Sequence, residues 1–287
     1  MILAWLKAIR PKTLVASFVP VLVGSKDFLL EKYLTTDAIM VLLGCFLFSG
    51  LVQIATNLAN DYFDSLKGAD NIRKNAPRRM VSTGEISADK MIRATFVLLI
   101  LAFGVGLSTL LTAGANFWFI GIGLLCLTFA VLYTAGPFAL AYNGLGDVFV
   151  IAFFGLVAVE GTNYLMSCVT SENWKVNLAL AFSVGLLINN LLVVNNYRDC
   201  EEDFNVGKRT TIVMFGKKLG IMLFIIGYLI PCTFALFNGN YLTLIIFIPS
   251  TLSLYFLIRG GNSKDFTSSL SLSAMSIIIF GFATLFY

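Results

Sequence analysis

The longest uncharged stretch, residues 94–146, constrains the fold more than any other feature of the sequence. A membrane-spanning helix needs about 20 mostly apolar residues, so this stretch can cross a bilayer twice, with a break near residues 112–116. Charged residues make up only 13% of the chain and hydrophobic residues 58%, whereas soluble domains carry about 25% charged residues. The sequence therefore predicts an all-α, polytopic membrane protein.

Charged residues divide the rest of the chain into further apolar segments of similar length. The segments predicted to span the membrane are residues 38–60, 148–171, 176–197, 219–258 and 266–287, of which 219–258 crosses twice around a break at residues 238–240. Residues 13–25 form a shorter segment, which must extend past Lys26 and Asp27 or begin before Pro11. The prediction is a bundle of nine transmembrane helices in a single domain, residues 1–287, with a central cavity on the cytoplasmic side.

The positions of the basic residues predict the orientation of this bundle. Residues 1–12 are predicted to form an amphipathic helix at the membrane interface, ended by Pro11, and not a signal peptide. With the N-terminus in the cytoplasm, all but three of the 20 Lys and Arg residues lie in cytoplasmic segments; the exceptions are Lys26, Lys32 and Lys175. We expect an integral protein of the cell (inner) membrane, with the N-terminus and any active site on the cytoplasmic side. The net charge of +4 then reflects orientation and anionic ligands, and nucleic acid is not an expected partner.

The chain contains no histidine, which restricts the chemistry of any site. A general base or a metal site must use carboxylate, amide or backbone oxygens, and these favour a hard cation such as Mg²⁺ or Ca²⁺. The five cysteines form no C-x-x-C pair, so neither a zinc site nor a disulfide framework is predicted.

The motif N-x-Y-x-D occurs twice, as NDYFD at residues 60–64 and NNYRD at residues 195–199, each at the end of an uncharged segment. Residues four apart share a helix face, so Asn60 lies with Asp64, and Asn195 with Asp199 and then Asp203. If the two helix ends face each other, three carboxylates and two amides surround one cavity. Their mutual repulsion predicts a divalent cation such as Mg²⁺, which binds one or two carboxylates together with phosphate oxygens.

Basic residues follow both motifs, and acids and bases in one loop suit a metal–diphosphate complex. They are Lys67, Arg73, Lys74, Arg78 and Arg79 after the first motif, and Arg198, Lys208 and Arg209 around the second. Such clusters also serve membrane topology or contact anionic lipids, and both interpretations stay open.

A third loop, residues 133–147, contains Tyr133, Tyr142 and Asp147 but no Lys or Arg. It is either a second wall of the substrate site or a plain Gly/Pro-rich turn. Glu160 falls inside an apolar segment near its far end, where a carboxylate is a functional candidate, but no role is assigned to it.

Six segments carry a resemblance to a known family: RPKTL (residues 10–14), NLANDYFDSLKGAD (57–70), LYTAG (132–136), GLGD (144–147), NNYRDCEED (195–203) and GKRTT (207–211). Together they resemble the UbiA superfamily of intramembrane prenyltransferases, and most closely its MenA type, the 1,4-dihydroxy-2-naphthoate polyprenyltransferases. That superfamily has nine transmembrane helices and two Asp-rich motifs, after helices 2 and 6.

The resemblance implies a site of metal ligands and substrate-binding residues. Asn60, Asp64, Asp199 and Asp203 would bind Mg²⁺, with Asp64 and Asp199 central to catalysis. The substrate-binding residues would be Lys67, Arg78, Arg79, Arg198 and Lys208 toward the polyprenyl diphosphate, Asn57, Tyr142, Asp147 and Asn196 near the aromatic acceptor, and Asp61 behind the metal ligands.

The implied reaction transfers a polyprenyl group to 1,4-dihydroxy-2-naphthoate with loss of CO₂, giving demethylmenaquinone. One alternative keeps the superfamily and changes the acceptor, for example to 4-hydroxybenzoate. Another is a membrane transporter, for which charges deep in the membrane would be expected; here Glu160 alone is deep.

Overall fold

The computed structural model describes residues 1–68, 78–136 and 139–286, so Asp70, Arg73 and Lys74 lie outside the described residues. Within these ranges the regular elements are all helices, accompanied by one isolated bridge between Asn143 and Arg209. The prediction of an all-α protein is confirmed.

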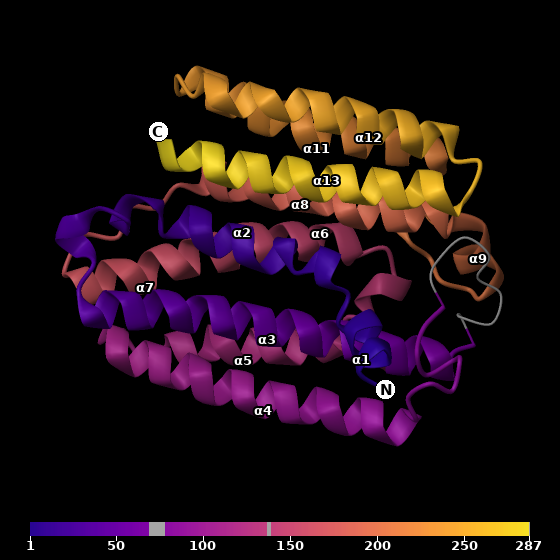
Figure 1. The fold of residues 1–287 in the computed structure, drawn as a ribbon, viewed down its shortest axis with the longest axis horizontal. Coiled ribbons are helices and arrows are strands. Elements are labelled where there is room, and N and C mark those ends of the chain that lie inside the picture. The colour runs from indigo at the N-terminus through magenta and orange to yellow at the C-terminus, as the bar shows by residue number, and fades with distance from the viewer. Residues whose placement is uncertain (69–77, 137–138, 287) are drawn as a thin grey trace.

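Seven helical segments are long and apolar enough to cross a membrane, and they run roughly side by side (Figure 1). They are α3 (Thr36–Leu66), α4 (Ala88–Ala113), the continuous α6 (Gly146–Val150), η5 (Ile151–Glu160) and α7 (Gly161–Thr170), α8 (Leu178–Arg198), α11 (Lys217–Phe237), η6 (Tyr241–Ile246) with α12 (Phe247–Arg259), and α13 (Ser263–Ala283) with η7 (Thr284–Phe286). Two further apolar helices, α2 (Val15–Gly24) and α5 (Phe119–Leu132), are shorter. The chain is an integral membrane protein.

Both predicted breaks inside the long apolar stretches are confirmed. Helix α4 ends at Ala113 because Gly114 adopts the left-handed conformation with φ 62°, and α5 begins five residues later at Phe119. Helix α11 ends at Phe237, followed by Asn238 and by Gly239 with φ 82°. Glycine reaches positive φ without a steric penalty, which is why both reversals fall at glycine.

The first apolar segment does not extend in either of the two ways expected for it. Helix α1 (Ile2–Ile9) ends where Arg10 turns left-handed with φ 55°, and Pro11 opens the short helix η1 (Pro11–Thr13). Helix α2 then runs only from Val15 to Gly24, and the chain turns into η2 (Lys26–Phe28) and η3 (Glu31–Tyr33). With Arg10 left-handed and Pro11 opening η1, α1 and α2 stay separate. The separate N-terminal helix is as predicted.

Helix α8 is the most buried of the seven long segments and packs against η5, α11 and α13. Its closest approach to η5, a π-helical segment, is at two facing glycines. A Cβ on Gly155 would lie 2.5 Å from the carbonyl oxygen of Ala181, and a Cβ on Gly185 would lie 2.6 Å from that of Ile151. The two backbones therefore touch, which holds α8 against the helix that carries Asp147 into the site.

Gly185→Ala is expected to lower the melting temperature in detergent, because the added methyl overlaps the Ile151 carbonyl and overpacking of this kind costs about 1–3 kcal/mol. Gly104→Ala is the matched control, since a Cβ on Gly104 meets no atom within 4 Å and alanine favours a helix. Equal melting temperatures for the two variants would contradict the close approach.

Glu160 is buried at the end of η5, beside the start of α8. Its Oε1 accepts a hydrogen bond from the backbone N–H of Asn177 at 2.9 Å, and its Oε2 accepts one from Nε1 of Trp174 at 3.3 Å. A carboxylate at a helix N-terminus is favoured by the helix dipole. Glu160 therefore holds the beginning of α8, about 30 Å by helix rise from the Arg198 end.

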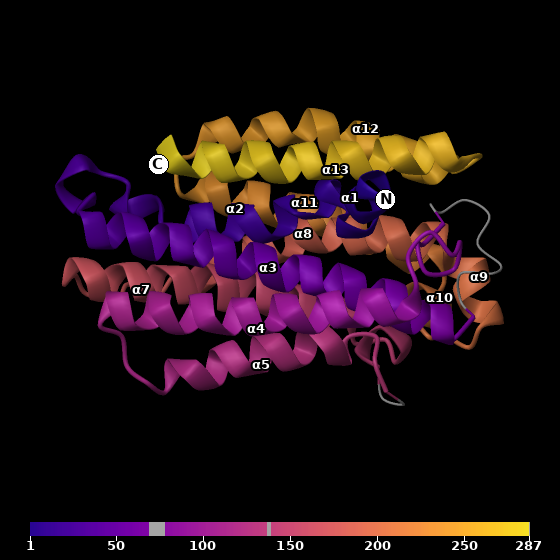
Figure 2. The ribbon, with the colours of Figure 1, turned by 60° about the horizontal axis from the view of Figure 1, so that its bottom comes forward.

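Helices α3 and α8 finish at the same end of the bundle, where the short helices α9 (Cys200–Asn205) and α10 (Thr211–Phe215) also lie (Figures 1 and 2). The helix η4 (Leu140–Tyr142) joins this end by backbone contact, because the N–H of Arg209 donates to the carbonyl of Tyr142 at 3.1 Å. The two N-x-Y-x-D motifs therefore meet at one end of the molecule.

Candidate active site

A cavity of about 680 Å³ opens among the ends of α3 and α8 and continues into the bundle. Its charged end is lined by Asp64, Arg78, Arg79, Arg198, Asp199 and Lys208, and its interior mainly by apolar residues of α4, α5 and η5. One face of α3 lines it from Asp64 to Cys45, about 28 Å by helix rise. That depth is close to the roughly 30 Å hydrocarbon core of a bilayer.

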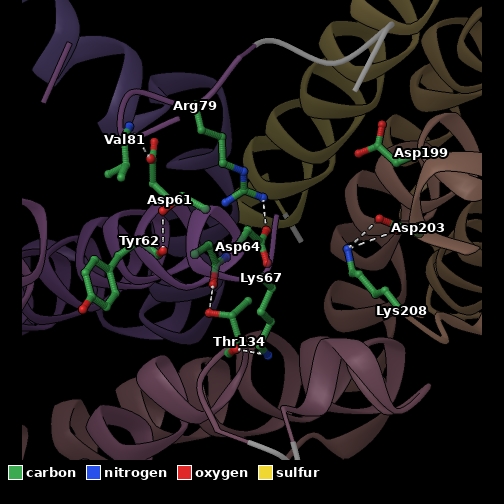
Figure 3. Close-up of polar contacts among 12 residues, drawn as sticks. Asp61, Tyr62, Asp64, Lys67, Arg79, Val81, Thr134, Asp199, Asp203 and Lys208 are labelled. Carbon is green, nitrogen blue, oxygen red and sulfur yellow. Dashed lines mark hydrogen bonds and ion pairs between the residues drawn. The ribbon is translucent and has the colours of Figure 1, made fainter. Parts of the chain in front are cut away.

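Asp64 lies on the α3 side of the charged end and is 1% exposed (Figure 3). Its Oδ1 accepts a hydrogen bond from the hydroxyl of Tyr142 at 2.8 Å, and its Oδ2 forms an ion pair with Nη2 of Arg79. One turn earlier, Oδ1 of Asn60 accepts from the hydroxyl of Thr134 at 2.8 Å. Side-chain partners from three separate segments thus hold the first motif in place.

The second motif is held by its own neighbours. Nε and Nη2 of Arg198 donate to the two carboxylate oxygens of Asp199 at 2.6 and 2.9 Å, a bidentate pair. Nζ of Lys208 lies 3.2 and 3.1 Å from the two oxygens of Asp203. Asn195 and Asn196 line the cavity beside Asp199.

The predicted meeting of the two motifs is found, but only two of the three predicted carboxylates line the cavity. Asn60, Asp64, Asn195 and Asp199 line the cavity, whereas Asp203 does not. Helix α8 ends at Arg198, Asp199 is the cap that it shares with α9, and Asp203 lies in α9. Its carboxylate is buried against Lys208, which does line the cavity.

Asp61 lies off the face shared by Asn60 and Asp64, as its spacing predicts. Its two carboxylate oxygens accept hydrogen bonds from the backbone N–H groups of Met80 and Val81, both at 3.0 Å (Figure 3). Asp61 lines the cavity, but both of its oxygens are engaged with the backbone next to Arg79, and its role in substrate binding stays a prediction.

Lys67 and Tyr142 do not line the cavity but lie behind Asp64. Nζ of Lys67 donates to the carbonyl of Thr134 at 2.8 Å and lies 3.8 Å from the centre of the Tyr142 ring. Burial lowers the pKa of Lys67, and the charge of Asp64 opposes that shift. Burial, and then the charge of Asp64, raise the pKa of Tyr142, so its phenol stays neutral and donates to Asp64.

Asn57 and Asp147 line the cavity and are also held firmly. Nδ2 of Asn57 donates to the carbonyl of Ile9 at 2.8 Å and to the hydroxyl of Thr13 at 3.0 Å, tying α3 to the turn that contains Arg10. Asp147 accepts from Nδ2 of Asn189 at 2.9 Å and from the hydroxyl of Thr211 at 2.5 Å.

Sequence reasoning missed several residues at this end because they are single polar side chains without a telling spacing. Thr134, Asn189 and Thr211 are the partners of predicted residues, and Arg10 lines the cavity mouth. Tyr133, which belongs to the third loop singled out in the sequence, lines the cavity. Burial, followed by the charges of Asp147, Asp64 and Asp203, raises its pKa. Thr134, Thr211 and Arg10 had one signal, membership of the LYTAG, GKRTT and RPKTL segments, whereas Asn189 lies in none of the quoted segments.

The oxygen ligands at the charged end fit a hard cation only when a bound phosphate group completes its coordination shell. Among the described residues, no group of three or more Asp, Glu, Cys or His side chains lies close enough together to hold a metal ion. Mg²⁺ takes one or two carboxylates and completes its shell with waters and phosphate oxygens. Asp64 and Asp199, with the amides of Asn60 and Asn195, are donors of that kind, and the basic residues beside them suit a phosphate.

Comparisons with known proteins agree with these features. The sequence pattern of the UbiA prenyltransferase family matches residues 17–280. A "1,4-dihydroxy-2-naphthoate octaprenyltransferase" of Haemophilus influenzae is 34% identical over 221 residues, covering 75% of this chain and 70% of the relative. A protein of the same name from Escherichia coli is 35% identical over 218 residues, covering 75% and 69%.

A solved structure shares the fold over nearly the whole chain. It is described as a UbiA homolog from Archaeoglobus fulgidus bound to DMAPP and Mg²⁺, and it superposes with a TM-score of 0.57 at 18% sequence identity, covering 98% of each chain. The family pattern, the curated relatives and the fold lead to the same assignment. The chain belongs to the UbiA prenyltransferase family.

Proposed function

We propose that this protein transfers a polyprenyl group from a polyprenyl diphosphate to 1,4-dihydroxy-2-naphthoate, with loss of CO₂ and diphosphate, giving demethylmenaquinol, the reduced form of demethylmenaquinone. The observation that carries the proposal is one cavity that runs about 28 Å from a charged end into an apolar interior. A diphosphate suits the first part and an isoprenoid tail the second. The acceptor is proposed from the relatives named as naphthoate octaprenyltransferases at 34 and 35% identity.

In this proposal the diphosphate binds at the charged end of the cavity. Arg78, Arg79, Arg198 and Lys208 line that end and would pair with the diphosphate oxygens as the C–O bond breaks and its electron pair passes to the leaving group. Mg²⁺, when bound to the donors around Asp64 and Asp199, would neutralise the diphosphate as it leaves. Its use here is supported by the fold neighbour described with DMAPP and Mg²⁺.

The acceptor would lie between the charged end and the apolar interior. Asn57, Asp147 and Asn196 line the cavity there and are the proposed contacts of the naphthoate. The ring carbon that bears the carboxylate attacks the allylic cation, and the bond to the carboxylate then breaks, releasing CO₂ and restoring the aromatic ring. Phe149 and Phe153, whose rings stack 5.7 Å apart beside the cavity, would exclude water from the cation.

We further propose nine membrane crossings in one domain, residues 1–287, with the N-terminus and the charged end in the cytoplasm. The seven long segments and the shorter α2 and α5 coincide with the nine apolar segments of the sequence. The strong bias of Lys and Arg to one side supports this orientation. A transporter is disfavoured, because the one deep carboxylate, Glu160, is engaged in holding α8.

Product analysis tests the function directly. Membranes holding the protein, incubated with Mg²⁺, 1,4-dihydroxy-2-naphthoate and all-trans polyprenyl diphosphates of several lengths, are expected to yield demethylmenaquinols, which are detected as demethylmenaquinones of the corresponding masses after oxidation by air. The same membranes receive 4-hydroxybenzoate and other aromatic acceptors in parallel. Prenylation of another acceptor alone would replace the naphthoate assignment, and absence of any prenylated product would overturn the proposal.

A further inference from the structure

Asp61 is a buried carboxylate next to the proposed metal ligands, and its contacts point to a different task. It is 1% exposed, and its two oxygens accept the N–H groups of Met80 and Val81 at 3.0 Å each. These N–H groups directly follow Arg79, whose guanidinium meets Asp64. Helix α3 therefore binds the 79–81 segment at two points: Asp61 binds the backbone of the segment, and Asp64 binds its arginine side chain.

The segment that Asp61 holds is a compact turn. The carbonyl of Arg79 accepts from the hydroxyl of Ser82 at 2.9 Å and from the N–H of Thr83 at 3.1 Å, and the carbonyl of Met80 accepts from the N–H of Ile86 at 3.1 Å. The Met80 side chain is 4% exposed and belongs to a core cluster. Four other buried members of that cluster are Ala4, Ala8, Leu58 and Met91.

Arg79 extends from this turn to the cavity wall. Its side chain is 8% exposed, and that of Asp64 is 2% exposed, so the ion pair is shielded from solvent. Asp61 and Asp64 are three residues apart on α3, about 4.5 Å along the helix axis. One turn of α3 therefore separates the carboxylate that holds the Met80 and Val81 backbone from the carboxylate that pairs with the Arg79 guanidinium.

We propose that Asp61 is a positioning residue, which fixes the 79–81 turn so that Arg79 meets Asp64 and the diphosphate, and that it binds neither metal nor substrate. This inference rests on the proposed donor, a polyprenyl diphosphate. Two charge-assisted hydrogen bonds to backbone N–H groups are strong and directional. If Asp61 turned toward a metal, the buried N–H of Met80 would lose its partner, which is costly in a buried site.

A double-mutant cycle on donor binding tests the proposal. The dissociation constant of geranyl diphosphate is measured by calorimetry, with Mg²⁺, on the full-length protein in detergent. Asp61→Asn is expected to weaken binding about 10- to 100-fold, as for other residues that orient a ligand-binding group. In an Arg79→Gln background the same change is expected to have little further effect, because the group that Asp61 positions is gone. Independent, additive losses would overturn the proposal.

The Mg²⁺ dependence separates a positioning role from a metal ligand. The concentration of Mg²⁺ that half-saturates geranyl diphosphate binding is expected to stay the same in Asp61→Asn, and a rise of tenfold or more would assign Asp61 to the metal. Asp89→Asn, which removes an exposed acid in the first turn of α4, is the control of equal charge change and is expected to bind like the wild type.

Hydrogen exchange gives a readout that needs neither ligand nor activity. The amides of Met80 and Val81 are expected to exchange faster in Asp61→Asn than in the wild type, while those of α3 and α4 do not change. Asp61→Ser, which keeps one hydroxyl acceptor, is expected to fall between them and serves if Asp61→Asn folds poorly. Unchanged exchange at both amides would overturn the positioning role of Asp61. If the wild-type protein binds geranyl diphosphate but makes no product, only the proposed acceptor chemistry is overturned.

Discussion

Asp64→Asn is expected to lower kcat/KM by about 100- to 1,000-fold, the range found when one preorganised electrostatic partner of a reacting group is removed. Asp64 is the buried carboxylate on the α3 wall, and it contacts Arg79 and Tyr142. An amide of the same shape keeps only one acceptor oxygen and removes the negative charge that attracts the cation. Product formation from naphthoate and a polyprenyl diphosphate, measured across Mg²⁺ concentrations, checks this.

A folding defect must be separated from this loss, because Asp64→Asn leaves Arg79 buried without its countercharge, which costs about 3–5 kcal/mol. The double variant Asp64→Asn/Arg79→Gln removes both charges. We expect its melting temperature to recover toward that of the wild type while its activity stays low. Asp37→Asn, an exposed acid in the first turn of the same helix, is the control and is expected to be active. Recovered activity in the double variant would contradict a metal-binding role for Asp64.

Val52→Trp is expected to change which polyprenyl diphosphates serve as substrates, and not to abolish catalysis. Val52 lines the cavity on α3, twelve residues or about 18 Å by helix rise from Asp64. A tryptophan there would fill the interior below the charged end. The ratio of kcat/KM for a long polyprenyl diphosphate to that for geranyl diphosphate is expected to fall about 100-fold, equivalent to roughly 3 kcal/mol.

Leu43→Trp is the control for this experiment, because Leu43 lies on the same helix but is 61% exposed on the outer surface of the bundle. It is expected to leave the ratio between the two donors unchanged. An equal loss for both donors in Val52→Trp would indicate a general packing defect. No loss for either would show that the isoprenoid tail leaves the cavity before it reaches residue 52.

The sequence predicted the long helices and their breaks with few errors. Residues 94–146 divide at Gly114 as expected, and residues 219–258 divide beside Gly239, because uncharged length and glycine are local signals. The error was α2, which was expected to extend beyond residues 13–25 but spans only Val15–Gly24. A Cβ on Gly24 would lie 2.3 Å from the carbonyl of Val159, so the end of α2 is shaped by a neighbour 135 residues away.

The candidate site was predicted only in part. The pairing of Asn60 and Asp64 with Asn195 and Asp199 followed from spacing on a helix, and all four line one cavity. Asp203 does not line the cavity and pairs with Lys208 instead, so its role as a metal ligand stays a prediction. The partners of Asp61 could not be predicted, because backbone N–H groups carry no sequence signal.

By itself the sequence determined that the chain is a helical membrane protein and that its acids gather at two helix ends. Those properties depend on apolar length and on helix periodicity, which act over one or two turns. Only the tertiary structure decided which basic side chain pairs with which carboxylate. Arg79 reaches Asp64 because a turn anchored by Asp61 brings it there, and Tyr142 reaches the same carboxylate from 78 residues away. Such contacts depend on how the helices pack, and no local pattern in the chain specifies that.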